Sequence, residues 1–112
     1  MSASRVRFQT LLTMGAEQDL ESLYDYITES DSSTSANKML NRLSTSIETL
    51  SRFPERGTVP KELLTLGIKE YRQITCGLYR LVYRTIGKRV IVYLIADGRR
   101  DMQSVLARRL LR

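Results

Sequence analysis

The chain alternates between two hydrophobic periods, one typical of strands and one typical of helices. Residues 5–12, RVRFQTLL, begin with valine and phenylalanine on one side and arginines on the other, which predicts a half-buried strand. Gly15 interrupts this pattern, and a helical period begins in residues 16–30, AEQDLESLYDYITES. A single apolar stripe predicts an amphipathic helix there, and its members are Ala16, Leu20, Leu23 and Ile27.

A second helix is predicted after a polar connection. Residues 30–35, SDSSTS, are rich in side chains that cap helix N-termini. The helix that follows should end near Phe53-Pro54, and its apolar stripe consists of Ala36, Leu40, Leu43, Ile47 and Leu50. Two helices joined by so short a turn form an antiparallel hairpin. Because neither stripe can be buried alone, both need a shared apolar surface.

The period changes to two after a loop at residues 54–67, which contains both prolines, two glycines and room for one helical turn at KELLTL. Strands are predicted at residues 68–75, 78–86 and 90–96, separated by a CG turn and a GKR turn. The last strand, VIVYLIA, is apolar on both faces, which is typical of the middle of a sheet. Residues 99–112, RRDMQSVLARRLLR, should form a short basic helix or a mobile tail.

The order of these elements is β-α-α-β-β-β plus a C-terminal segment, which predicts an α+β fold. A three-stranded antiparallel meander, extended by the N-terminal strand, would be covered on one face by the helical hairpin in a two-layer arrangement. Residues 1–112 fit a single domain with one modest core.

Composition limits the chemistry of this domain. With no histidine and only Cys76, the usual zinc ligands and every histidine-dependent catalytic pair are excluded. No apolar run approaches the roughly 20 residues that cross a bilayer, and the N-terminus lacks the features of a secretion signal. A lone cysteine suits a reducing compartment. We therefore expect a cytoplasmic protein without metal or cofactor, in which carboxylates, lysine, tyrosine or arginine would carry any catalysis.

The positive charge is concentrated in the C-terminal half. Residues 1–51 hold four basic and seven acidic side chains, a net charge of −3, whereas residues 52–112 hold fourteen and five, a net charge of +9. Fourteen of the eighteen basic residues are arginine, which binds phosphate and carboxylate in bidentate geometry. This asymmetry favours an anionic partner, either nucleic acid or an acidic protein segment. The alternative is that the charge serves solubility alone.

Five short patterns together resemble the RelE/ParE superfamily of toxins from bacterial type II toxin–antitoxin pairs, most closely the ParE branch. They are A-x-x-D-L-x-x-x-x-x-Y-I from Ala16, L-x-x-F-P-x-x-G from Leu50, G-I-K-E-Y-R from Gly67, Y-R-L-V-Y-R from Tyr79 and G-R-R-D from Gly98. Each pattern alone is weak, but five in this order over about residues 6–101 make a fairly specific match. The chain departs at Asp97, where many relatives carry histidine.

The resemblance implies a small cytoplasmic toxin whose unchecked activity stops bacterial growth. For the ParE branch the implied target is DNA gyrase, inhibited by protein contacts with no cofactor. For the RelE branch it is mRNA, cut in the ribosomal A site. In both, a cognate antitoxin wraps its acidic C-terminal segment around the toxin to form a hetero-oligomer. A third reading is a relative that has lost toxicity and only binds its antitoxin.

Arginines on the predicted meander are the first candidates for binding the target or the antitoxin. Arg80 and Arg84 alternate onto one face of their strand. A two-residue CG turn would set Arg72 opposite Leu81, on the other face from Arg80 and Arg84. A three-residue turn would set it opposite Val82, on the same face as those two arginines. The trio could then form an anion-binding surface. The alternative is that each arginine pairs with a local acid in a surface ion pair worth about 0–1 kcal/mol.

The C-terminal segment supplies further candidates. Its cations could contact DNA, gyrase or the antitoxin, or the segment could be a solubilising amphipathic cap that packs on the sheet. The candidate residues are Arg99, Arg100, Arg108, Arg109 and Arg112.

Ribonuclease chemistry is the second hypothesis for function. Cleavage through the 2′-hydroxyl needs groups that remove a proton, stabilise the phosphorane and protonate the leaving oxygen. Lys69, Arg72, Arg84 and a tyrosine are candidates for these roles. However, the lysine cluster and the C-terminal tyrosine of the ribonuclease branch are missing, and the last tyrosine, Tyr93, lies within an apolar strand. No catalytic residue is therefore assigned in the first hypothesis.

Overall fold

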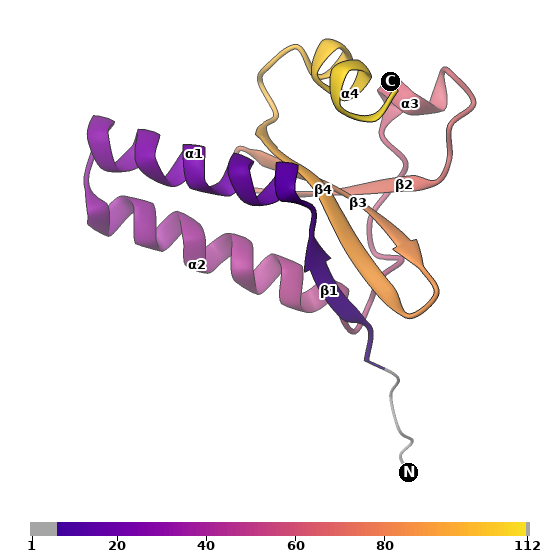
Figure 1. The fold of residues 1–112 in the computed structure, drawn as a ribbon, viewed down its shortest axis with the longest axis horizontal. Helices are drawn as coiled ribbons and strands as arrows, with labels where there is room; N and C mark the ends of the chain where they lie inside the picture. Colours follow the sequence, from indigo (N-terminus) through magenta and orange to yellow (C-terminus); the bar gives the residue numbers. More distant parts are fainter. Residues whose placement is uncertain (1–6, 112) are drawn as a thin grey trace.

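The computed structural model describes residues 7–111. Arg5 and Val6 of the predicted first strand, and Arg112, lie outside this part of the chain. Figure 1 shows the elements, which are β1 (Gln9–Leu12), α1 (Met14–Ser30), α2 (Ser33–Leu50), α3 (Lys61–Leu64), β2 (Tyr71–Cys76), β3 (Tyr79–Ile86), β4 (Arg89–Asp97) and α4 (Met102–Leu110). The predicted α+β fold with β-α-α-β-β-β order is confirmed, and the C-terminal segment is a helix.

The four strands form one open sheet in the order β1-β4-β3-β2. β2, β3 and β4 make the predicted antiparallel meander, and β1 extends it by pairing in parallel with β4. β4 therefore has a neighbour on each side, as its two apolar faces predicted. The N-terminal strand thus lies next to the last strand of the chain.

The α1–α2 hairpin is set by its caps and covers one face of the sheet (Figure 1). Thr13 accepts a hydrogen bond from the Ala16 amide at 3.1 Å, and Ser32 accepts one from the Ser35 amide at 3.1 Å, so each helix N-terminus is capped. The main core lies between this hairpin and the sheet, and its largest fully buried members are Leu43, Leu50, Leu81, Tyr83, Val90, Val92 and Ile95. Each such side chain contributes roughly 1.5–3 kcal/mol through burial.

A smaller core forms where α3 and α4 cover part of the opposite face. Val82, Leu94 and Ala96 of the sheet are buried there against Leu63 of α3 and against the apolar stripe of α4, which consists of Met102, Val105 and Leu106. Asp101 caps α4 by accepting a hydrogen bond from the Ser104 amide at 3.3 Å. The predicted amphipathic cap on the sheet is therefore the structure that this segment adopts.

The β2–β3 register differs from both predicted registers. The two-residue turn consists of Gly77 and Leu78 instead of Cys76 and Gly77, because Gly77 takes the positive φ of 61° that a glycine-first turn requires. The pairing therefore sets Arg72 opposite Tyr83, on the face covered by the α1–α2 hairpin. Both predicted partners of Arg72 were wrong, and Arg72 does not share a face with Arg80 and Arg84.

Candidate partner-binding surface

Arg72 fixes the loop that precedes α3. Its guanidinium donates hydrogen bonds to the Gly57 carbonyl at 2.6 Å and to the Glu55 carbonyl at 3.4 Å. The same loop is held by Tyr83, whose hydroxyl donates to the Pro54 carbonyl at 2.6 Å and accepts from the Gly57 amide at 3.1 Å. Burial raises the pKa of the Tyr83 phenol, which keeps it neutral and able to donate. The Arg72 guanidinium is therefore engaged in hydrogen bonds within the protein.

Arg80 joins three elements on the opposite face. Its guanidinium makes a bidentate ion pair with Glu62 of α3, at 3.0 and 2.9 Å, and also donates from Nε to Gln73 of β2 at 2.7 Å. The Arg80 and Glu62 side chains are only 12% and 14% exposed. Hydrogen bonding from Arg80 lowers the pKa of Glu62. Arg80 therefore anchors the short helix α3 and is not available as a free cation.

Arg84 and Lys69 do not converge with Arg72. Arg84 is half-buried with its guanidinium carbon 5.9 Å from the centre of the Tyr71 ring, and Tyr71 in turn packs edge-on against Tyr93. Lys69 lies in the exposed segment before β2. The three candidate ribonuclease groups thus lie in separate places, with Arg72 and Arg84 on opposite faces of the sheet.

Arg109 ties α4 to α1 and to the sheet. It makes a bidentate ion pair with Asp19, at 2.8 and 2.9 Å, and donates to the Tyr93 carbonyl at 2.9 Å. Asp19 also accepts a hydrogen bond from the Ile95 amide at 3.0 Å, beyond the end of β1 where that edge of β4 has no strand partner. Hydrogen bonding to Asp19 raises the pKa of Arg109. We call this contact the Asp19–Arg109 clip.

The loop before α4 carries two exposed residues of the predicted binding set, Arg99 and Arg100. Arg99 pairs with Asp97 at 2.7 Å, and its side chain is 72% exposed. Hydrogen bonds from Arg99 lower the pKa of Asp97 to about 2. Arg100 and Arg108 are also exposed. Because an exposed pair contributes little stability, the Arg99–Asp97 contact can be exchanged for contacts with a partner.

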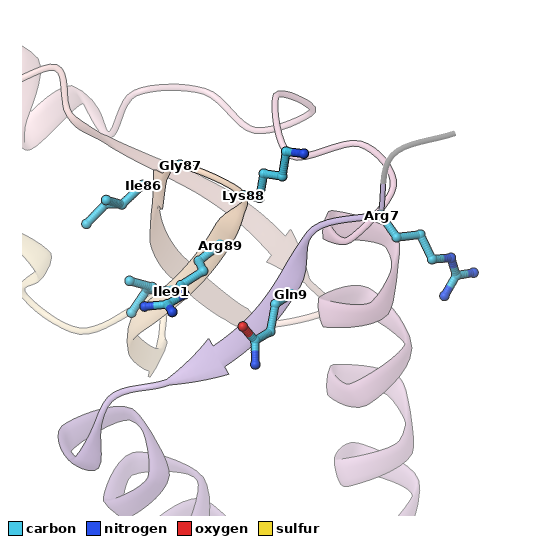
Figure 2. A pocket seen from close by; sticks show the side chains of 7 residues that line it. All are labelled: Arg7, Gln9, Ile86, Gly87, Lys88, Arg89 and Ile91. Carbon is cyan, nitrogen blue, oxygen red and sulfur yellow. The ribbon is translucent and has the colours of Figure 1, made fainter. Parts of the chain in front are cut away.

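A surface that the sequence reasoning missed lies at the other end of the sheet. A shallow groove of about 600 Å³ opens beside β1, the β3–β4 turn and the start of β4, and Figure 2 shows the side chains that line it. They are Arg7, Gln9, Ile86, Gly87, Lys88, Arg89 and Ile91, and we call this the cationic groove. The signal was present in the sequence TIGKRVI, where Lys88 and Arg89 lie between isoleucines, but GKR was interpreted only as a turn.

Within residues 7–111, no three cysteine or carboxylate side chains come close enough together to hold a metal ion. None of the helices in this range has the length and apolar character needed to span a membrane.

The family is decided by comparison with known proteins. The family model described as the ParE toxin of the type II toxin–antitoxin system parDE matches residues 11–102. This chain belongs to the ParE toxin family. It is therefore the toxin component of a type II toxin–antitoxin system, within the RelE/ParE superfamily.

Solved structures share the fold of this ParE-family toxin. A chain of the chromosomal ParDE system from P. aeruginosa is 18% identical with a TM-score of 0.69, over 84% of this chain and 98% of that one. A chain of the RelBE2 toxin–antitoxin complex from Mycobacterium tuberculosis is 21% identical with a TM-score of 0.58, over 86% and 97%. A comparison with curated proteins found no match.

Several residues that carry the sequence resemblance hold the ParE-family fold together. Asp19 of the first pattern forms the clip, Gly57 of the second packs against β2, and Arg72 of the third fixes the loop around Gly57. Arg80 and Tyr83 of the fourth pattern anchor α3 and the same loop. The patterns thus identify the fold. Of the exposed cations proposed to meet a partner, Arg99 and Arg100 belong to the fifth pattern, and Arg108 lies outside all five.

Proposed function

We propose that this ParE-family toxin binds and inhibits DNA gyrase in the cytoplasm, thereby stops DNA replication and growth, and is neutralised by a cognate antitoxin. The observation that carries the proposal is the match to the ParE family model over residues 11–102, together with the resemblance of the chain to the gyrase-directed branch. The similarity to solved ParDE and RelBE2 systems supports an antitoxin partner.

The geometry of the arginines favours binding over RNA cleavage. A ribonuclease needs its general acid, general base and phosphorane-stabilising groups within hydrogen-bond reach of one phosphate. Arg72 and Arg84, two of the three candidates, lie on opposite faces of the sheet, and Arg72 already donates to two backbone carbonyls. This separation supports a toxin that acts through protein contacts.

The proposed contact surface for the target consists of Arg99, Arg100 and Arg108. These exposed cations flank the beginning and end of α4, which is fixed by its own apolar stripe and by the Asp19–Arg109 clip. Such a rigid helix keeps the cations in place before binding, which lowers the entropy cost of association.

Two assays on purified toxin test the proposal. In a gyrase supercoiling assay we expect inhibition by the native toxin, and at least roughly tenfold weaker inhibition by Arg99→Glu/Arg100→Glu, a loss of about 1.4 kcal/mol in binding. The matched control is Lys38→Glu/Arg42→Glu, which reverses two exposed cations on α2 and should inhibit as the native toxin does. Cooperative unfolding of both variants must be shown first.

Translating ribosomes provide the contrasting assay. Cleavage of mRNA without gyrase inhibition would replace the proposal with a RelE-like endonuclease. Inactivity in both assays, with antitoxin binding retained, would indicate a relative that serves only as an antitoxin-binding module. Equal inhibition by the loop variant and the native toxin would refute the contact surface while leaving the gyrase target in place.

A further inference from the structure

Tyr26 is an aromatic side chain that the fold leaves in solvent. It lies on α1 and is 68% exposed. Within residues 7–111, its ring makes no stacking or cation–π contact and its hydroxyl makes no hydrogen bond. The nearby Tyr24, by contrast, packs against the main core and donates a hydrogen bond to Asn37 at 2.9 Å. A single exposed apolar side chain is ordinary, so the neighbours of Tyr26 decide what its exposure means.

These neighbours come from the loop between β4 and α4. Tyr26 follows Asp19 by about two helical turns, so both side chains lie on the side of α1 that faces β4 and α4. Asp97 raises the pKa of the Arg99 guanidinium by hydrogen bonding. Tyr79 and Tyr26 contribute to the same increase, so both rings lie near that cation. An exposed tyrosine and an exposed arginine thus share one surface.

Leu78 adds an aliphatic side chain to this surface. It is 54% exposed at the second position of the turn between β2 and β3, and its carbonyl accepts a hydrogen bond from the Gly98 amide at 2.8 Å. The turn itself does not require leucine. The turn between β3 and β4 also opens with a glycine of positive φ, Gly87, and has Lys88 at the corresponding position. The exposed leucine therefore has no role in the turn that a polar residue could not fill.

The two loops are held firmly against each other and against the sheet. A Cβ atom at Gly98 would lie 3.0 Å from Cδ of Arg80, whose guanidinium is fixed by Glu62, so the loop before α4 rests directly on that side chain. Asp97 accepts hydrogen bonds from the Arg99 amide at 2.9 Å and from its guanidinium at 3.0 and 2.7 Å. Groups that are fixed before binding lose little entropy on association.

We call the surface formed by Tyr26, Leu78, Arg99 and Arg100 the distal patch. Tyrosine and arginine are among the residue types that dominate the binding energy of protein–protein interfaces. The loop sequence DGRRD carries two acidic and two basic side chains, so its net charge is zero. A phosphate backbone or a strongly acidic segment therefore gains less long-range attraction here than at the cationic groove, which lies at the other end of β3, roughly 25 Å away. The distal patch instead fits a folded protein surface with an apolar pocket and a few carboxylates.

We propose that the distal patch docks on gyrase, with the Tyr26 ring and Leu78 as apolar anchors in a pocket of the enzyme and the two arginines paired with carboxylates at its margin. The identity of the partner rests on the proposed function. The inference extends the contact surface from the cations around α4 to α1 and the β2–β3 turn. It assigns most of the binding energy to the aromatic ring, which charge alone would not indicate.

The test measures the binding of labelled full-length toxin to purified gyrase, with the supercoiling assay alongside. Tyr26→Ser should weaken binding at least roughly thirtyfold, the loss typical of an interface hot spot, and Leu78→Ser should weaken it by several-fold. Serine and tyrosine have similar helix propensities, so Tyr26→Ser should leave unfolding stability unchanged. Tyr26→Phe keeps the ring, and its affinity should stay within about threefold of that of the native toxin.

Matched controls separate a specific contact from a general loss of apolar surface. Met14→Ser and Leu66→Ser remove side chains that are 74% and 55% exposed elsewhere on the molecule, and neither should change gyrase binding. The effect of Tyr26→Ser should be the same at low and at high salt, because apolar contact is not screened, whereas the effect of Arg100→Glu should shrink as salt is raised. Thermal unfolding verifies the fold of each variant.

The possible failures are distinguishable. Gyrase binding by Tyr26→Ser at the native level would overturn this inference while leaving gyrase inhibition in place, and so would equal losses in Tyr26→Phe or in the Met14→Ser and Leu66→Ser controls. If the native toxin neither binds nor inhibits gyrase, the proposed function fails and this inference fails with it. In that case Tyr26-dependent binding of a short DNA duplex, Tyr26-dependent capture of the co-expressed antitoxin, or self-association that Tyr26→Ser abolishes would each give the distal patch a different occupant.

Discussion

Replacement of Asp19 by alanine should destabilise the protein far more than its position on a surface helix suggests. The carboxylate of Asp19 accepts two hydrogen bonds from Arg109, at 2.8 and 2.9 Å, and one from the Ile95 amide at 3.0 Å. Removing it leaves a guanidinium and a backbone N–H without their acceptor. Both losses occur at the junction of α1, β4 and α4, so a large local effect is expected.

The size of the expected loss in unfolding free energy follows from how deeply Asp19 and Arg109 are buried. Breaking a fully buried ion pair costs about 3–5 kcal/mol, but Arg109 is 33% exposed and Asp19 16% exposed, so water can recover part of that cost. We take about half for the ion pair and add ~1 kcal/mol for the Ile95 amide, which gives ~2.5–3.5 kcal/mol of unfolding free energy. With a urea slope of about 1.5 kcal/mol/M, the denaturation midpoint should fall by roughly 2 M.

The assay is urea unfolding of the native toxin, Asp19→Ala, Arg109→Met and the double variant. The double-mutant cycle should give a coupling free energy of roughly 1–2 kcal/mol between the two side chains. Asp25→Ala is the matched control, because Asp25 lies exposed on the same helix, and its effect should stay within about 0.5 kcal/mol. A coupling near zero, or an equal effect of the Asp19 and Asp25 substitutions, would refute the clip as a stabilising contact.

Two further predictions concern the loop before α3 and the loop before α4. Gly57→Ala should lower the free energy of unfolding by roughly 2–4 kcal/mol in urea titrations. The reason is that the new methyl carbon would lie 2.6 Å from the Gln73 carbonyl oxygen and 2.7 Å from the Tyr83 hydroxyl. A loss below about 1 kcal/mol would contradict that close packing. The pKa of the Asp97 carboxyl is 3.8 in its ordinary state and about 2 in the folded protein, because Arg99 donates hydrogen bonds to it. The stabilising contribution of this pairing is therefore fully present above pH 3.8, and it disappears as the pH falls through about 2. The Arg99 amide resonance should titrate near pH 2, and an inflection close to pH 4 would contradict the pairing.

Most of the fold could be predicted from hydrophobic period and capping residues. The α1–α2 hairpin, the meander and the central place of β4 all follow from patterns within short segments, and α1 begins at Met14, only two residues before the predicted start. The hairpin register was not predicted, because both of the turns considered, the two-residue and the three-residue one, began at Cys76, whereas Cys76 pairs with Tyr79. A glycine-first rule would have found it, since Gly87 also opens its turn with a positive φ, of 60°.

The candidate site was harder to predict, because long-range pairing decides which cations are free. Arg109 and Asp19 are separated by 90 positions in the sequence, and Arg80 and Glu62 by 18, so no local pattern indicates either pair. Lys88 and Arg89, whose side chains form no ion pair within residues 7–111, were interpreted as ordinary turn residues. The sequence therefore contains an excess of positive charge but does not identify the residues that leave it exposed.

The division of the arginines into two groups determines which experiments can report on binding. Arg72, Arg80 and Arg109 make internal contacts that hold the loop at 54–58, the four-residue helix α3 and helix α4 in place. Charge reversal at these positions would place a carboxylate next to backbone carbonyls or another carboxylate, and toxicity would be lost through unfolding whether or not the residue touches a partner. Substitutions at Lys88, Arg89, Arg99 and Arg100 do not have this ambiguity. With unfolding stability unchanged, a loss of gyrase inhibition in those variants would have to arise from a missing contact with the target, and a loss of antitoxin binding from a missing contact with the antitoxin.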